Sequence, residues 1–199
     1  MNNGDEQFRN DKALIERVLN GDALAFGVVI KNTERLVAQI VSKMINDASD
    51  RKDIAQDIYL KAFHKLGNFQ FQAKLSTWIA HIAYNTCTDH LRKKSVKLFG
   101  DSFHDAESIG MTIGDGSKQP IDGNEFMHQK DIAQILDREI EKLPPVYRTL
   151  INLYHQQELS YLEIEAITEI PMGTVKNYLF RARKMLRTNL LLQYKREDL

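Results

Sequence analysis

The sequence predicts an all-α protein with two small helical domains, an N-terminal helical bundle and a C-terminal helix-turn-helix, joined by a flexible linker. In two long regions apolar residues recur at spacings of three and four, as they do on amphipathic helices. A stretch rich in glycine, serine and aspartate separates these regions, and no segment indicates a strand. The expected boundaries are 1–95 for the first domain, 96–125 for the linker and 126–199 for the second domain.

Three helices are expected in the first third of the chain. The helical period runs over residues 11–45, and a break at 20–22 divides it into two helices. Ser49 or Asp50 is placed to cap a third helix, which the Gly-Asn pair at 67–68 ends. The residues of this third helix that are expected to face the core are Ile54, Ile58, Leu60, Ala62, Phe63 and Leu66.

A fourth helix is expected at about residues 75–94, with Trp78 in its apolar stripe. After the linker the helical period returns at Phe126 and stops at Pro144, and Pro145 favours the first turn of the next helix. These elements complete the bundle and begin the second domain.

The last two helices have the clearest boundaries in the sequence. Ser160 and Glu163 have the spacing of a capping box, which opens a short helix, and residues 171–174 open a long one. Two helices joined by a short turn match a helix-turn-helix, whose second helix lies in the major groove of DNA. The polar residues and their neighbours that are expected outside the apolar stripe are Thr174, Lys176, Asn177, Tyr178, Phe180, Arg181, Arg183, Lys184 and Arg187.

An ordinary basic C-terminal helix would show a similar composition, because the helix dipole favours lysine and arginine near that end. The capping box and the turn favour DNA binding over this alternative.

The balanced charge of the chain, 27 basic against 27 acidic residues, conceals charged blocks. Residues 67–99 carry a net charge of +4 and residues 171–199 one of +5, whereas residues 100–142 carry −6. Each positive segment can meet a polyanion while the acidic stretch is repelled from it. The sequence thus predicts two separate DNA-contacting segments.

Aromatic and basic residues alternate through the loop and helix at 69–94, a mixture that suits single-stranded DNA because bases stack on rings and phosphates attract cations. Trp78 lies in the apolar stripe, which favours a core position. For Tyr84 and Asn85, nearer the polar face, core packing and DNA contact remain equally open. The residues of this mixture are Phe69, Phe71, Lys74, Trp78, His81, Tyr84, Asn85, Arg92, Lys93 and Lys94.

Two carboxylates, Asp53 and Asp57, lie four residues apart on one helix face. They could form an acid–base pair, but solvated carboxylates near a helix start are commoner. With Gln56 and Lys61 nearby, a polar docking surface for another protein is the favoured interpretation. No phosphate-binding loop, dinucleotide fingerprint or nucleophile elbow is present, so we expect a protein that is not an enzyme.

The single cysteine, Cys87, excludes an internal disulfide and any zinc or iron–sulfur site built on cysteines. A metal site with His81 and His90 is disfavoured, because six helical residues rotate by about 600° and leave His81 and Cys87 about 120° apart. No run approaches the ~20 apolar residues of a membrane span. We expect a cytoplasmic protein without metal or cofactor.

Taken in order, these motifs resemble the extracytoplasmic-function (ECF) group of bacterial RNA polymerase sigma factors, in the sigma-70 family. The resemblance covers residues 11–188, and the order and spacing of the motifs are highly specific. The segments that carry it are Asp53-Ile-Ala-Gln-Asp57, Lys61-Ala-Phe63, Ser76-Thr-Trp-Ile79, Ile82-Ala-Tyr-Asn85, Leu143-Pro-Pro-x-Tyr-Arg148, Leu159-Ser-Tyr-x-Glu-Ile164, Ile170-Pro-x-Gly-Thr-Val175 and Arg181-Ala-Arg183.

The resemblance implies a transcription initiation factor that binds core RNA polymerase through its clamp and flap, recognises the −35 promoter element and melts the −10 element. An anti-sigma factor is a further partner that it implies, and no membrane insertion is expected. The residues that the resemblance assigns to docking on the polymerase are Asp53, Gln56, Asp57 and Lys61.

Capture of flipped bases of the −10 non-template strand would fall to the loop after the docking helix and to the helix behind it. The residues assigned to this role are Phe69, Gln70, Phe71, Gln72, Lys74, Tyr84, Asn85 and Arg92.

The −35 element would be read by the long C-terminal helix. The residues assigned to it are Thr174, Lys176, Asn177, Phe180, Arg181, Arg183 and Lys184.

The chain departs from the family pattern at three places. Residues 70–72 replace the Arg-Gly-Asp or Arg-Gly-Glu that is usual in the base-capture loop, so the preferred base is expected to differ. Glu165 stands where a small residue is common and Glu169 where glycine often makes the turn. Unusual helix spacing, with Ala166 compensating, is the expected consequence.

Two other functions remain as alternatives to a sigma factor. An ordinary helix-turn-helix regulator with a sensory N-terminal domain would need a ligand pocket or a dimer interface within residues 1–95. A nucleic-acid enzyme using the carboxylate pair is more remote.

The acidic linker has two interpretations of its own. It resembles the segment that, in similar factors, threads towards the active-site and RNA-exit channels of the polymerase. The competing interpretation is a solvated tether between the two domains.

Overall fold

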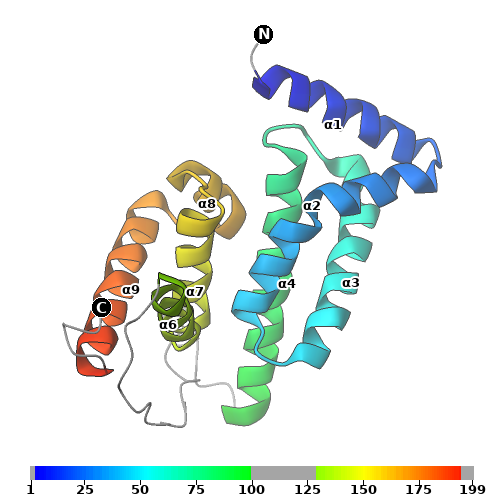
Figure 1. Cartoon of the computed structure of the whole chain (residues 1–199). Coiled ribbons are helices and arrows are strands. Elements are labelled where there is room, and N and C mark those ends of the chain that lie inside the picture. The colour runs from blue at the N-terminus through cyan, green and yellow to red at the C-terminus, as the bar shows by residue number, and fades with distance from the viewer. Residues whose placement is uncertain (1–2, 100–128, 194–199) are drawn as a thin grey trace.

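The computed structural model describes residues 3–99 and 129–193, and within them it is helical without strands, which confirms the predicted fold class (Figure 1). Two groups of helices lie side by side, one from each part of the chain. The first group consists of α1 (Asn3–Leu19), α2 (Ala23–Met44), α3 (Ala48–Lys65), the short 3₁₀ turn η1 (Leu66–Asn68) and α4 (Leu75–Phe99).

The second group forms the C-terminal helix-turn-helix and the helices that support it. Its elements are α6 (Gln129–Glu141), α7 (Pro145–Ile151), the π-helical turn η2 (Asn152–Gln156), α8 (Tyr161–Thr168) and α9 (Met172–Gln193). The expected linker at 96–125 lies outside the described residues except for 96–99, which belong to α4. The expected restart of helix at Phe126 also lies outside them.

Aspartates cap the two central helices of the N-terminal group. The Asp22 carboxylate accepts from the backbone N–H of Ala25 at 3.1 Å, and α2 begins there. The Asp47 carboxylate accepts from the N–H of Ser49 at 2.9 Å and caps α3. Expecting Ser49 or Asp50 as this cap was wrong, because Asp47 holds the extended backbone of a cap and its side chain satisfies the first free N–H groups.

The helix-turn-helix is formed as the sequence predicts. The Ser160 hydroxyl accepts from the Glu163 N–H, and the Glu163 carboxylate accepts from the Ser160 N–H at 3.0 Å, which completes the capping box. The helix α7 begins at Pro145, also as expected. The helix α8 ends at Glu169 in the left-handed conformation, with φ of 56°.

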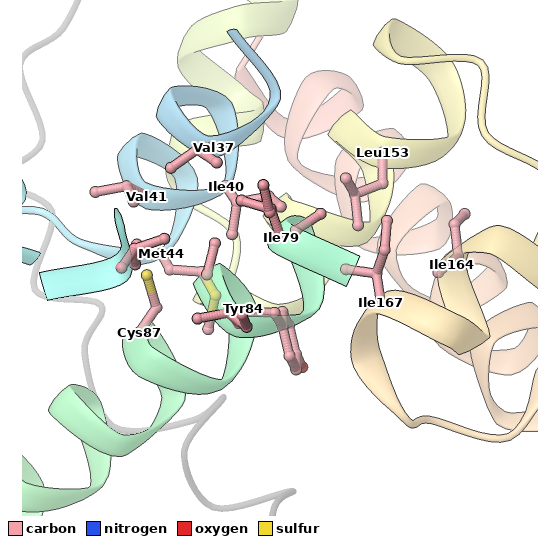
Figure 2. Close-up of a cluster of buried hydrophobic side chains, with 14 of the residues drawn as sticks. Val37, Ile40, Val41, Met44, Ile79, Tyr84, Cys87, Leu153, Ile164 and Ile167 are labelled. Carbon is pink, nitrogen blue, oxygen red and sulfur yellow. The ribbon is translucent and has the colours of Figure 1, made fainter. Parts of the chain in front are cut away.

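Both groups of helices share one buried apolar cluster. Figure 2 shows Ile40 of α2 and Ile79 of α4 in the same cluster as Leu153, Ile164 and Ile167 of the C-terminal group. Burying aliphatic side chains of this size stabilises by roughly 1.5–3 kcal/mol each. The contact between the two groups is therefore an apolar interface of the same character as the core of each.

Two predicted core residues of α3 lie on the surface instead. The side chains of Leu60 and Phe63 are 59% and 48% exposed, whereas Ile54, Ile58 and Ala62 are buried as expected. The apolar residues of α3 therefore divide between the core and an exposed face, and predicting all of them as core was wrong.

Candidate nucleic-acid and protein interfaces

The helix α9 presents a polar face that is opposite to its buried stripe. Val175, Leu179, Ala182 and Leu186 are buried against the supporting helices. The ring of Phe180, 67% exposed, lies on the outer side. Of the residues assigned to −35 recognition, Thr174 is half-buried, and those that are exposed with Phe180 are Lys176, Asn177, Arg181, Arg183 and Lys184.

A stacked tyrosine pair that the sequence did not single out supports two cations of this face. The rings of Tyr154 and Tyr161 stack with their centroids 5.0 Å apart. The Nζ of Lys176 lies 5.3 Å from the centre of the Tyr161 ring, and the Arg183 guanidinium lies 5.5 Å from that of Tyr154. These cation–π contacts restrict where the two cations can point. The pair forms across the η2 turn, which no local sequence pattern predicts.

The turn of the helix-turn-helix contains the two glutamates at which the chain departs from the family pattern. The Glu165 carboxylate accepts from the backbone N–H of Met172 at 3.1 Å and so satisfies a free donor where α9 begins. Glu169 supplies the left-handed turn that glycine often makes. Its carboxylate also lies 3.7 Å from the Nε2 of His81 on α4.

Three of the residues assigned to strand capture, Phe69, Gln70 and Gln72, line one part of a cavity of about 290 Å³. Phe69 is buried, and its ring packs 5.2 Å from that of Trp78 and 4.8 Å from that of Phe71, whose backbone has a positive φ of 56°. Gln70 and Gln72 are exposed and bonded to each other. The cavity is lined by Asn68, Phe69, Gln70, Gln72, Ala73, Thr77, Trp78, His81 and Ala166.

Two residues of α4 that are assigned to the same role lie against the C-terminal group. The side chain of Tyr84 is only 5% exposed, so its placement near a polar face was wrong. Burial raises the pKa of its hydroxyl to about 12, and Tyr178 of α9 adds to this rise. The Asn85 amide lies 3.1 Å from the Nε2 of His81, whose Nδ1 lies 3.1 Å from the Ile167 carbonyl of α8.

The basic residues of this region differ in their surroundings. Lys74 is exposed, and its ammonium pairs with the Glu163 carboxylate of α8 at 2.9 Å. Arg92 is exposed and pairs with Asp89 one turn before it.

The residues assigned to docking share the outer face of α3. Asp53, Gln56 and Asp57 are exposed, and Lys61 pairs with Asp57 at 2.7 Å. Leu60 lies on the same helix between these polar residues and is exposed, although the sequence did not assign it to the docking site.

The apolar character of this face extends beyond α3. The ring of Phe63 packs 5.0 Å from that of Phe26 on α2, and Leu24 and Val28 of α2 are also exposed. An apolar centre with a polar rim is typical of protein–protein interfaces. The docking face, defined here as Asp53, Gln56, Asp57, Leu60 and Phe63, therefore has the composition of such an interface.

Comparison with known families and proteins identifies both groups of helices. The family model for sigma-70 region 2 matches residues 29–96, and the one for sigma-70 region 4 matches residues 129–186. The RNA polymerase sigma-H factor of Pseudomonas aeruginosa is 32% identical over 177 residues, which cover 88% of this chain and 91% of that protein. The chain belongs to the ECF group of the sigma-70 family.

Further relatives agree with this family. The ECF RNA polymerase sigma-E factor of Escherichia coli K12 is 32% identical over 176 residues, with 88% of this chain and 92% of that protein covered. Among solved structures, CnrH in complex with the cytosolic domain of CnrY aligns over 92% of this chain and 99% of its own, with a TM-score of 0.62 and 21% identity.

A second solved structure, the sigma factor RpoE in complex with the anti-sigma factor NepR from Bartonella quintana, aligns over 85% of this chain and 98% of its own. Its TM-score is 0.61 at 20% identity. Both alignments support the fold of this family member.

Within residues 3–99 and 129–193, no three histidine, cysteine or acidic side chains come together as a metal site would need. None of the helices in that same part of the chain combines the length and the apolar character that a bilayer span requires.

Proposed function

We propose that this chain is an ECF sigma factor that binds core RNA polymerase and directs initiation at promoters with a −35 and a −10 element. The observation that carries this proposal is that one chain of this family has two surfaces of different chemistry. The docking face on α3 combines exposed apolar and acidic residues, and the outer face of α9 is cationic. Residues 1–95 would serve as region 2 and residues 126–199 as region 4, joined by the linker at 96–125. The role is that of a specificity factor, with no catalysis of its own.

Region 4 would read the −35 element with the exposed side chains of α9. Arginine and lysine make bidentate contacts with guanine edges or bind phosphates, and asparagine pairs with adenine. The cation–π contacts of Lys176 and Arg183 would preorganise these cations for the duplex. Asn177 and Arg181 would supply the remaining contacts at the centre of the face.

Region 2 would hold the melted −10 strand at the cavity beside α4. Asn85 and the exposed glutamines of the loop would bond to base edges, and the half-buried ring of Phe71 would stack on a base, whereas Phe69 is buried and would support the loop from within. A captured base offsets a few kcal/mol of unstacking and unpairing. Because residues 70–72 replace the usual loop motif, the preferred base would differ from that of the relatives.

The docking face would bind the polymerase clamp, and region 4 would bind its flap. Anti-sigma partners are part of the proposal because a solved structure of the same fold, that of RpoE from Bartonella quintana, was determined in complex with the anti-sigma factor NepR. The protein would act in the cytoplasm, where polymerase and promoter meet.

Run-off transcription with purified core polymerase tests the proposal. The chain should convert core polymerase into an enzyme that starts at defined sites on genomic fragments, and the variant Leu60→Asp should not. Strong sequence-specific duplex binding by the free protein, unchanged by polymerase, would instead support the ordinary regulator.

A further inference from the structure

The helix α1 contacts the loop at 69–74 that is assigned to strand capture, although it precedes the residues that the region 2 model matches (Figure 1). The carboxylate of Asp11 is buried and accepts from the backbone N–H of Leu75, the first residue of α4, at 3.2 Å. A carboxylate at the N-terminus of a helix satisfies a free donor and is favoured by the helix dipole. One turn before Asp11, the ring of Phe8 packs edge-on against that of Phe71, with the centroids 5.5 Å apart. One face of α1 thus contacts this loop both at its middle and where α4 begins.

Phe71 has a backbone conformation that phenylalanine rarely adopts. Its φ of 56° lies in the left-handed region, which glycine enters freely and a bulky residue does not. The family pattern has glycine at this position, so the chain keeps a glycine-like turn while it carries a ring there. Such a conformation persists only where the surrounding structure determines it. The rings of Phe8 and Phe69, with centroids 5.5 and 4.8 Å from that of Phe71, are the surroundings that hold the turn.

The ring of Phe71 does not line the cavity beside the loop. Its neighbours Gln70 and Gln72 both line that cavity, whereas Phe71 packs against Phe8 of α1. Phe8 is 47% exposed, although it is a large apolar residue, and Phe71 is half-buried. The two rings, named here the aromatic pair, therefore offer an apolar surface outside the cavity.

An unpaired base is the ligand that suits the aromatic pair. Every base has a face that stacks on an aromatic ring, and single strands are bound by series of such rings. The pair is continuous with the loop that would hold a base in the cavity, so the next base of the same strand is the nearest occupant. Arg9 and Lys12 of α1 are exposed beside Phe8, and cations attract the phosphates of a strand. A protein partner would need a wider apolar surface than two rings.

We propose that Phe8 and Phe71 form a stacking site, outside the cavity, for the unpaired base next to the captured one. Phe8 is a positioning residue in this site because it holds Phe71, and it also presents the more exposed of the two rings. The inference rests on the proposed function for its ligand, a single DNA strand, and deepens that function by adding α1 to the strand-binding surface. Stacking tolerates any base, so this position of the strand should be read less strictly than the base in the cavity.

Removing the ring of Phe71 without disturbing the turn tests the site. Phe71→Gly does this, because glycine adopts the left-handed conformation without strain. The probe is a fluorescent −10 non-template strand without an upstream element, added to the complex of the full chain with core polymerase. The variant should bind this strand at least about fivefold more weakly than the parent, the lower end for the loss of one stacked base. Helix content and binding to core polymerase should be unchanged, because Phe71 lies outside the helices and outside the docking face.

Substitutions at Phe8 separate ring stacking from apolar packing. Phe8→Tyr keeps a ring and should bind the strand as the parent does. Phe8→Leu keeps an apolar side chain of similar size without a ring, and its affinity should fall between those of the parent and Phe71→Gly. Equal loss of affinity in Phe8→Tyr and Phe8→Leu would contradict the positioning role of the ring.

A fluorescent base reports the stacking itself. The adenine analogue 2-aminopurine, whose fluorescence is quenched when it stacks on a ring, is placed at successive positions of the strand. With the parent it should be quenched next to the captured base, and with Phe71→Gly at saturating complex this quenching should be lost. Unchanged strand affinity or unchanged quenching in Phe71→Gly would overturn the inference, and so would a matching loss of binding to core polymerase. If the parent complex captured no strand at all, the proposed function itself would fail.

Discussion

Replacing Arg148 by methionine should destabilise the whole fold, because this one side chain of α7 joins the ends of two other helices. Arg148 is 3% exposed, and its guanidinium donates to the carbonyl of Lys43 at the end of α2 and to that of Glu141 at the end of α6, at 2.5 and 2.8 Å. It also donates to the Glu141 carboxylate at 3.0 Å and to the Asn46 side chain at 2.9 Å. Carbonyls at helix ends have no partner within the helix, so the arginine satisfies groups that would otherwise remain unpaired.

The size of the expected destabilisation depends on which hydrogen-bond partners of Arg148 become hydrated after the substitution. The carboxylate of Glu141 and the side chain of Asn46 are exposed enough to be hydrated after the change, whereas each unpaired carbonyl costs about 1–3 kcal/mol. The expected loss is about 3 kcal/mol of the free energy of unfolding, at the lower end of the range for breaking a buried ion pair. For a chain of this length that corresponds to a fall of about 6–12 °C in Tm.

Thermal unfolding followed by circular dichroism and urea unfolding measure this change. Asn46→Ala is the matched control, because it removes one exposed acceptor and should cost no more than about 1 kcal/mol. A fall in Tm below about 2 °C for Arg148→Met would refute the argument that these carbonyls at helix ends depend on the arginine.

Three further outcomes concern the proposed interfaces. Leu60→Asp should weaken binding to core polymerase by about tenfold or more with helix content unchanged, because it buries a carboxylate in an apolar contact. If a pull-down with core polymerase were unaffected, the docking face would be removed from the proposal. Arg181→Ala should cost ~1–3 kcal/mol of −35 binding free energy if the arginine makes a bidentate contact with a base. If it contacts a phosphate, the substitution should lower the salt dependence of the affinity instead, and titration of duplex DNA at several salt concentrations distinguishes the two. Asn85→Ala should leave closed complexes intact while it lowers the permanganate reactivity of −10 thymines, and normal melting would exclude it from strand capture.

The parts of the structure that the sequence predicted are those set by neighbours in the chain. The capping box of Ser160 and Glu163 and the start of α7 at Pro145 depend on side chains within a few residues of the backbone that they serve. The buried stripe and polar face of α9 follow from its period alone. The outward position of Lys176 and Arg181 was for that reason predictable.

The parts that it missed depend on contacts distant in the sequence. Whether Leu60 faces the core or a partner depends on where α2 packs against α3, and the period of α3 is the same in both cases. The stacking of Tyr154 on Tyr161 requires the η2 turn, and the contacts of Arg148 with Lys43 and Asn46 join residues about a hundred positions apart. No local pattern contains these pairings.

The packing of α8 on α4 did leave a signal in the sequence. Ile82, Ala83 and Tyr84 are consecutive and all buried, yet successive residues of a helix point about 100° apart, so three of them span about 200° of its surface. A helix packed on one side buries a narrower stripe, and a wider one indicates a second neighbour. Here α2 and α3 cover one side of α4 and α8 covers another. The second side also carries His81 and Asn85, and their side-chain polar atoms have hydrogen-bond partners there, so these polar residues are compatible with packing beside α8.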